Sequence, residues 1–405
     1  MATTDQSSAG REQRVRDWIR ALTDLPDRFA GTPVERAAAE RIGGWMRTLA
    51  ARDVALEPAP SAPRAGFVLA LHTGLALLGL WIGGFLGVLL TGVALWSFRS
   101  ELRHGRPQLA RLLPSSASVN VCGRLGATSP RRRVVLSAHI DSAQAGLLFA
   151  PSMADRFASL ASKLRPGGAP PTGPLAFPEA LVIAAFVLAV ASWMGAHGFL
   201  MGLLRFVVEI GLLVNAGLTL QWAWSPPTPG ANDNASAVAA MLTCAERLAP
   251  ELPDDVELWM VGTGAEEVGL CGMHGFVDDH AAWASETTYY VNFECVGGGT
   301  LHYIRSEGLL AKTHFPPALN EIARTVAASG EFGAVTPTDL LAATDGNVPA
   351  ARGYPTLSLI SLEANGVPRN YHRLDDTVDA IDTAMVVRAA DFGAAVVVAA
   401  LRKPT

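Results

Sequence analysis

Acidic and histidine residues follow several short apolar runs of this 405-residue chain. Short apolar runs bounded by turn residues are typical of buried strands. The polar residues are His139 and Asp141 after Val134–Ala138, Glu266 and Glu267 after Val256–Val261, Glu294 after Tyr289–Phe293, and His372 beyond Thr356–Ser361. Functional groups of open α/β sheets gather at the carboxyl ends of strands, so we expect these side chains to converge on one site.

Two histidines and several carboxylates, with no cysteine in the set, favour a metal such as zinc, manganese or cobalt. Two metals that share a carboxylate would lower the pKa of a water and polarise a carbonyl group. Of the adjacent Glu266 and Glu267, one can bind metal while the other takes a proton from the attacking water. Asp141 is placed to accept a hydrogen bond from the second ring nitrogen of His139. The ordered set therefore indicates metal-assisted chemistry.

These residues need a scaffold, and the spacing of apolar residues predicts one. Helical spacing predicts amphipathic helices over 15–22 and 34–49, and strands are predicted over 54–57 and 118–124. After Pro229, predicted strands alternate with predicted helices over 235–248, 317–329 and 383–401. The pattern predicts an α/β fold with a mixed central sheet and helices on both faces. An apolar stripe over 153–164 predicts a further amphipathic helix, suited equally to a bilayer surface or to a core.

Two long apolar blocks interrupt this scaffold. Phe67–Phe98 contains no Asp, Glu, Lys or Arg, and Leu175–Trp224 contains only three such residues. A bilayer core of about 30 Å needs about 20 helical residues for each crossing. If the strands predicted over 54–57 and 118–124 belong to one sheet, and the polar groups before and after the second block meet at one site, each block must leave and return on the same side. We therefore predict two inserted transmembrane helical hairpins.

The hairpins are predicted to turn at Gly83–Gly84 and at residues 195–198. The legs of the first hairpin are only about 15 residues, or about 22 Å, so it either spans with local thinning of the bilayer or is re-entrant. A soluble cap or an oligomer interface is the alternative for both hairpins. The predicted organisation is N-terminal helices and strand (1–63), first hairpin (64–114), first metal ligand and amphipathic segment (115–174), second hairpin (175–225) and remaining hydrolase domain (226–405).

Charge and cysteine usage limit the partners and the compartment. A net charge of −5, without basic runs interleaved with aromatic residues, predicts no nucleic-acid partner. The four cysteines are far apart in sequence, which favours free thiols in a reducing compartment, and the polar N-terminus predicts no cleavable signal peptide. The oligomeric state stays open.

The distribution of basic residues predicts an orientation in the membrane. The basic residues that flank the blocks on the hydrolase side are Arg64, Arg99, Arg103, Arg106, Arg111, Arg156, Lys163 and Arg165, and both predicted turns lack Lys and Arg. Positive residues favour the cytoplasmic side. We expect a multi-pass protein of the cell membrane with a cytoplasmic catalytic domain.

Five motifs carry a family resemblance. AHIDS (138–142), GANDNASA (230–237), GAEEVGLCG (264–272), NFECVG (292–297) and NYHRLDDTVD (370–379) resemble the successive signatures of metallopeptidase family 28, the di-zinc aminopeptidases. The resemblance covers roughly residues 115–150 and 226–400. It implies a fold like that of the zinc exopeptidases.

The resemblance also implies a zinc cofactor, with two ions per chain, and a role for each motif residue. His139, Asp233 and Glu294 match the ligands of one zinc, and Asp233, Glu267 and His372 match the ligands of the other. Asp233 would then bridge the two ions. The resemblance further implies that Glu266 is the general base and that Asp141 supports the first histidine.

Two of the departures from the family pattern concern candidate site residues. Glu294 stands where the family often has Asp, and Gly346 follows Asp345 where the family often has His. Asp345 is therefore a weaker candidate for a supporting role. Neither departure removes a metal ligand.

The predicted function is that of a membrane-embedded zinc-dependent exopeptidase, an aminopeptidase in which a metal-bridged hydroxide attacks the scissile carbonyl group. Its partners would be the lipid bilayer and a peptide or small amide substrate. A glutaminyl-cyclase-like acyltransferase with a single zinc is one alternative. A non-catalytic membrane scaffold that keeps the hydrolase fold is another.

Overall fold

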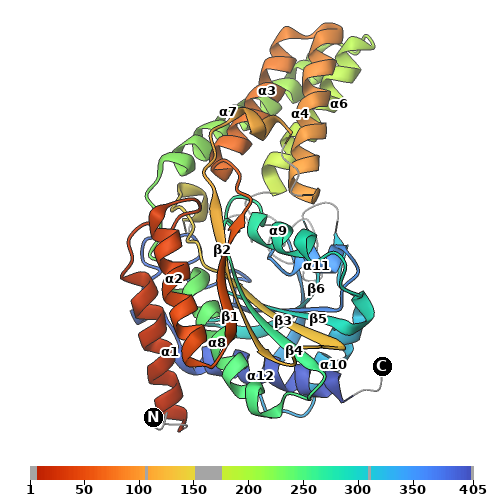
Figure 1. Cartoon of the computed structure of the whole chain (residues 1–405). Coiled ribbons are helices and arrows are strands. Elements are labelled where there is room, and N and C mark those ends of the chain that lie inside the picture. Colours follow the sequence, from red (N-terminus) through yellow and green to blue (C-terminus); the bar gives the residue numbers. More distant parts are fainter. Residues whose placement is uncertain (1–6, 105–107, 151–175, 309–311, 403–405) are drawn as a thin grey trace.

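A central mixed sheet organises the chain, and a helical bundle projects from one end of it (Figure 1). The structure is a computed structural model of the 405-residue chain that describes residues 7–104, 108–150, 176–308 and 312–402. The predicted amphipathic helix over 153–164 and the loop after it lie outside the described residues.

The described residues form a nine-stranded sheet of order β1-β2-β4-β3-β5-β9-β6-β7, with β8 beside β6. The strands are β1 (Arg52–Ala59), β2 (Ser118–Gly126), β3 (Arg132–His139), β4 (Val256–Thr263), β5 (Thr288–Glu294), β6 (Thr300–Glu307), β7 (Thr313–His314), β8 (Val335–Leu340) and β9 (Thr356–Leu362). β4, β3, β5 and β9 run parallel, whereas β2 and β6 are antiparallel to their neighbours in this group. Four carboxyl ends therefore meet at one edge of the sheet.

Alternating side chains of the parallel strands pack against helices on both faces of the sheet. On β3, Val134 and Leu136 belong to the core that includes residues of α1, α2, α8, α10 and α12, whereas Val135 packs in the core that includes residues of α9 and α11. These helices are α1 (Ser8–Thr23), α2 (Pro33–Thr48), α8 (Ala237–Leu248), α9 (Cys271–Asp279), α10 (Pro317–Ala327), α11 (Asn347–Ala351) and α12 (Thr383–Leu401). Burial on both faces explains the nearly continuous apolar composition of these strands, and it confirms the predicted α/β class.

Both apolar blocks form helical hairpins, and the two hairpins pack together as one bundle (Figure 1). The first consists of α3 (Ala65–Ile82) and α4 (Gly84–His104), the second of α6 (Ala176–Trp193) and α7 (Phe199–Trp224). Their turns meet at the far end of the bundle, where the rings of Phe85 and Trp193 lie 5.9 Å apart. A side chain at Gly66 would come within 2.4 Å of the Thr219 carbonyl oxygen, so α3 and α7 cross closely because the residue is glycine.

The first hairpin is longer than its apolar run predicts, with legs of 18 and 21 residues. α4 continues beyond Phe98 because charged residues of its last turns find partners. Arg99 pairs with Glu179 of α6 at 3.2 Å, and Glu101 accepts hydrogen bonds from the backbone N–H groups of Gln108 and Ala110. The expected 15-residue legs are therefore an underestimate.

Three helices of the described chain are long and apolar enough to cross a membrane, namely α3, α7 and α12. α12 packs in the main hydrophobic core, where Val386, Phe392 and Val396 are fully buried. The helices of the bundle instead expose apolar side chains. Exposed large hydrophobic residues of the described chain lie on these helices or in the turn after α6, with the exceptions of Leu112, Leu147 and Leu374. Apolar surface of this extent on a water-soluble monomer is unusual.

Candidate metal centre

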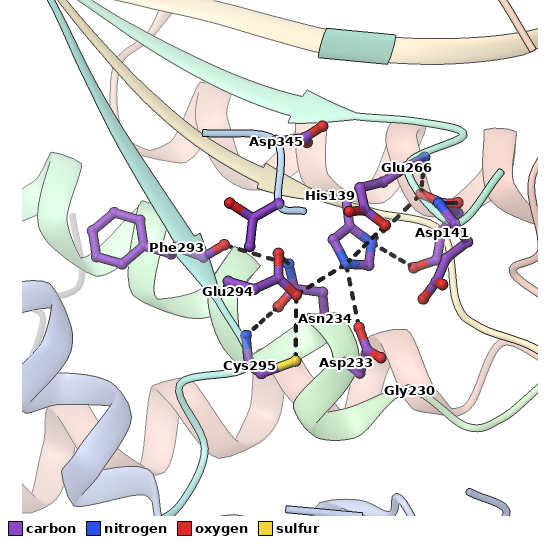
Figure 2. A network of polar contacts seen from close by, with 12 residues as sticks. His139, Asp141, Gly230, Asp233, Asn234, Glu266, Phe293, Glu294, Cys295 and Asp345 are labelled. Atoms are coloured by element: carbon purple, nitrogen blue, oxygen red, sulfur yellow. Dashed lines mark hydrogen bonds and ion pairs between the residues drawn. The ribbon is translucent and has the colours of Figure 1, made fainter. Parts of the chain in front are cut away.

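The carboxyl ends of the parallel strands carry most of the candidate side chains. His139 is the last residue of β3 and Glu294 the last residue of β5, while Glu266 and Glu267 follow β4 after a two-residue turn. His372 comes from the loop between β9 and α12. Figure 2 shows His139, Asp233, Glu266 and Glu294 directed toward one another. The structure thus brings together the residues that the strand ends predicted.

Asp233 reaches the same point from an irregular turn that precedes α8. The turn begins after Gly230, whose φ of +65° suits glycine, and the peptide bond between Asp233 and Asn234 is cis. The carboxylate of Asp376 accepts hydrogen bonds from the backbone N–H groups of Asn232 and Asp233, at 2.8 and 3.1 Å. These bonds fix the turn, and the Asp233 side chain is 1% exposed.

The two oxygens of Asp233 face two different histidines. Oδ1 lies 3.2 Å from Nε2 of His139, which is also 3.5 Å from Oε1 of Glu294. Oδ2 lies 3.3 Å from Nε2 of His372, which is also 3.3 Å from Oε2 of Glu267. Asp233 is therefore common to two groups, each with one histidine and one further carboxylate.

These residues fit a metal. Two ligand atoms bound to one zinc at about 2.0–2.1 Å with a tetrahedral angle lie about 3.3 Å apart, which matches the separations around both histidines. Asp233 Oδ2 and Glu267 Oε1 are buried and have no hydrogen-bond partner among the described residues. Buried acceptors without donors are costly, and a cation would satisfy them.

The charge of the cluster also favours the binding of cations. Burial raises the pKa of Glu266 and of Glu267 well above their usual range. Burial lowers the pKa of His372 to about 4, so its imidazole is neutral and able to bind metal at neutral pH. For His139 burial acts in the same direction, but the carboxylates of Glu294 and Glu266 outweigh it and raise its pKa. Several buried carboxylates near two imidazoles form an excess of negative charge that bound cations would neutralise.

Asp141 contacts the second ring nitrogen of His139, as expected, but mainly through its backbone. Nδ1 of His139 lies 3.1 Å from the backbone carbonyl oxygen of Asp141 and 3.5 Å from its Oδ1. The Asp141 carboxylate instead accepts the backbone N–H groups of Glu266 and Glu267, each at 3.1 Å. Since the backbone oxygen satisfies the imidazole, the carboxylate is free to fix the segment that carries the two glutamates.

Other buried charged residues that the sequence did not single out hold the same loops. Glu35 of α2 accepts hydrogen bonds from Ala265 N–H at 3.0 Å and from Ser118 Oγ at 2.6 Å, and burial raises its pKa to about 7. The buried Arg28 donates to backbone carbonyl oxygens, including those of Ile140 and Gly230. No local pattern marks these residues, although Asp376 stands within the motif NYHRLDDTVD.

Cys295 was also outside the predicted set. Its thiol lies 3.3 Å from Oε1 of Glu294, and its Sγ lies within 4.8 Å of carboxylate oxygens of Asp233 and Glu294. All four cysteines of the chain are buried and free. The carboxylate of Asp345, the weaker candidate, accepts a hydrogen bond from the hydroxyl group of Thr263.

Comparison with known proteins shows which families and structures parts of this chain resemble. Residues 219–397 match the family model for peptidase family M28. The chain is 29% identical over 186 residues to the endoplasmic reticulum metallopeptidase 1-A of Caenorhabditis elegans, and 45% identical over 53 residues to the aminopeptidase YwaD of Bacillus subtilis. These alignments cover 44% and 13% of this chain, but only 20% and 11% of the two relatives.

The fold is similar to that of a solved zinc aminopeptidase from Bacillus subtilis, with a TM-score of 0.54 and 15% sequence identity. The superposition covers 95% of this chain and 94% of that structure. At this identity the likeness shows the fold alone. It agrees with the predicted zinc-exopeptidase architecture.

Proposed function

Because residues 219–397 match the model of peptidase family M28, we propose that the chain is a zinc-dependent aminopeptidase that removes N-terminal residues from peptides. The observation that carries the proposal is the position of Asp233. Its two oxygens lie 3.2 and 3.3 Å from the ring nitrogens of His139 and His372. A carboxylate shared in this way supports a centre with two zinc ions.

Each ion would have its own group of ligands. One group consists of His139, Asp233 and Glu294, and the other of Asp233, Glu267 and His372. When bound, zinc lowers the pKa of a water molecule and polarises a scissile carbonyl group. The protein contributes the geometry, since the ligands are buried and their loops are held by hydrogen bonds.

Glu266 is the proposed general base. Its Oε2 lies 3.9 Å from Nε2 of His139, and its side chain is 11% exposed, more than any of the five proposed ligands. Burial raises its pKa, so the carboxylate holds a proton more readily than a solvated glutamate. This residue would accept the proton of the attacking water and return it to the leaving amine.

The set of proposed ligands also helps to distinguish a hydrolase from an acyltransferase and from a non-catalytic scaffold. A single-zinc acyltransferase needs only one of the two groups, whereas both groups are assembled here around Asp233. A non-catalytic scaffold would have no need of Glu266 beside the ligands. The presence of both groups and of the base supports a hydrolase over these alternatives.

We further propose that the bundle of α3, α4, α6 and α7 lies in a lipid bilayer with the sheet domain on the cytoplasmic side. The exposed apolar side chains of the bundle support this, and so does the length of α7, 26 residues or about 39 Å. Inside the bundle, Arg205 is paired with Glu209 at 2.8 Å and donates to the carbonyl oxygen of Leu80, which reduces its cost in lipid.

Metal analysis and peptide hydrolysis by the detergent-purified protein would test the enzymatic proposal. We expect two zinc ions per chain and release of N-terminal residues from free peptides but not from N-acetylated ones. A Glu266→Gln variant should keep both zinc ions and lose a factor of about 10²–10⁴ in kcat. Glu286→Gln, at an exposed glutamate, is the matched control and should change nothing.

Two results would contradict the proposal. Equal cleavage of N-acetylated peptides would exclude an aminopeptidase. One zinc per chain together with cyclisation of N-terminal glutamine would favour the acyltransferase.

A further inference from the structure

The two histidines of the centre are held in different ways. Nδ1 of His139 lies 3.1 Å from the backbone carbonyl oxygen of Asp141. Nδ1 of His372 is buried and has no hydrogen-bond partner among the described residues. A histidine that binds metal almost always donates its other ring N–H to a carbonyl or carboxylate oxygen, which fixes the ring. His372 needs another means of orientation.

Aromatic rings surround the His372 imidazole instead. Its ring centroid lies 4.2 Å from that of Phe149, 4.0 Å from that of Tyr371 and 6.1 Å from that of Trp222. Phe149 packs edge-on against both Trp222 and Tyr371, at 5.2 and 5.7 Å. Such ring pairs are directional, and they restrict the rotation of an enclosed side chain.

Trp222 is itself fixed by hydrogen bonds. Its Nε1–H donates to the backbone carbonyl oxygen of Gln144 at 2.9 Å. The side chain of Gln144 in turn donates to the carbonyl oxygens of Ala223 and Ser225, at 3.2 and 2.8 Å. A Cβ at Gly146 would lie 3.0 Å from Trp222 Cδ1, so the chain passes close against the indole ring. The orientation of Trp222 is therefore well determined.

Trp222 also belongs to the second hairpin, because it stands in the last turn of α7. The cluster around it includes Leu69 of α3 and Phe98 of α4, together with Leu148 and Phe149 of the short helix η2 (Leu147–Phe149). Apolar contacts thus run without interruption from the helices of the bundle to the imidazole of His372.

We propose that Phe149 and Trp222 are positioning residues for His372, and that the second hairpin thereby completes the metal group formed by Asp233, Glu267 and His372. The two rings take the place of a hydrogen-bonded partner, which Nδ1 of His372 does not have among the described residues. This inference rests on the proposed zinc centre. It assigns the insertion a part in metal binding besides any role as an anchor.

Zinc titration of the full-length protein in detergent would test the inference, with Trp222→Leu and Phe149→Leu as the test variants. We expect the wild-type protein to bind two zinc ions, and each variant to bind one ion as before and the other about 10–100-fold more weakly. Trp222→Phe keeps a ring but loses the bond to Gln144, so its affinity for the second ion should be intermediate.

Trp224→Leu is the matched control. This tryptophan is on the same turn of α7 but is 69% exposed and packs against Phe67, away from His372. The variant should bind both ions like the wild type. Near-ultraviolet circular dichroism would verify that each variant keeps its tertiary structure.

Unchanged affinity for both ions in folded Trp222→Leu and Phe149→Leu would overturn the inference, and so would equal weakening of both sites. If Trp222→Leu fails to fold, Phe149→Leu and Trp222→Phe decide between these outcomes. A wild-type protein that binds one ion or none would instead contradict the proposed function, so the two failures are distinguishable.

Discussion

The guanidinium of Arg28 donates a 3.0 Å hydrogen bond to the backbone carbonyl oxygen of Gly230. The same group donates to the carbonyl oxygens of Pro229 at 2.8 Å and Ile140 at 3.3 Å. Ile140 follows the proposed ligand His139, and Gly230 stands three residues before the proposed ligand Asp233. Arg28 therefore joins the two ends of the segment that contains the second hairpin.

Replacement of Arg28 by Met should destabilise the protein by about 3 kcal/mol or more, because it leaves several buried carbonyl groups without donors. Arg28→Lys should restore only part of this stability, since an ammonium group cannot match the planar fork of the guanidinium. Chemical denaturation measures both effects. Arg36→Met, at an exposed position of α2, is the control, and a loss of similar size there would contradict the explanation.

Replacement of Asp141 by Ala should weaken catalysis more than folding. The variant loses the acceptor of the Glu266 and Glu267 N–H groups, so the proposed base and its neighbouring ligand are no longer fixed. We expect zinc affinity and kcat to fall by about 10–100-fold each. Zinc titration and steady-state kinetics measure these losses, with the exposed Asp254→Ala as the control. Wild-type kinetics in Asp141→Ala would exclude this role.

The stability of the protein should depend on pH through Glu307. Burial raises the pKa of Glu307 from 4.5 to about 8, although the hydroxyl and backbone N–H groups of Thr344 donate to it. The folded state thus holds a proton that the unfolded state releases above pH 4.5. This contribution to the free energy of unfolding is complete below pH 4.5 and is lost as the pH rises through about 8.

A Glu307→Gln variant should remove this dependence. The difference between the midpoint temperature of thermal unfolding of the variant and that of the wild type should increase between pH 5 and pH 9. The increase should be a few degrees, because each kcal/mol of stability shifts the midpoint by about 2–4 °C. Glu286→Gln, at an exposed position, should follow the wild type across the range. A constant difference between Glu307→Gln and the wild type would show that Glu307 does not titrate in this window.

Cysteine labelling in intact cells would test the orientation of the bundle. Because all four native cysteines are buried, an introduced surface cysteine would be the reactive one. In the proposed orientation a membrane-impermeant maleimide labels Ala196→Cys, in the turn between α6 and α7, without permeabilisation. Ala281→Cys, in the exposed segment after α9, should be labelled only after permeabilisation. The reverse pattern would invert the topology, and labelling of both would argue against a bilayer.

Local sequence pattern was enough to predict the strands that position the site. β3, β4, β5 and β9 are apolar runs because both of their faces are buried, and the polar residue at or after each carboxyl end marks the edge where the site forms. The strands β6, β7 and β8 were not predicted. β8, with the sequence VTPTDL, contains a proline and is largely exposed, so it has no alternation of apolar and polar residues to detect.

The residues that hold the ligands could not be predicted, because their contacts join distant parts of the chain. Arg28 meets Gly230 across 202 positions, and Glu35 meets Ala265 across 230. Neither pair lies within one helix or strand, so no periodicity relates their members. The additional role of the Asp141 carboxylate could not be predicted for the same reason, since it accepts hydrogen bonds from a loop more than 120 residues away.

The length of α7 has a consequence for which substrates can be reached. The helix spans about 39 Å, whereas the apolar part of a bilayer is about 30 Å thick, so a helix that stands along the bilayer normal would extend about 9 Å beyond the lipid. Trp222 is in its last turn, beside the metal centre. The helix is then a fixed spacer that would sort polypeptides by how far their free ends extend from the membrane. Lipid-tethered peptides with spacers of graded length would measure that height.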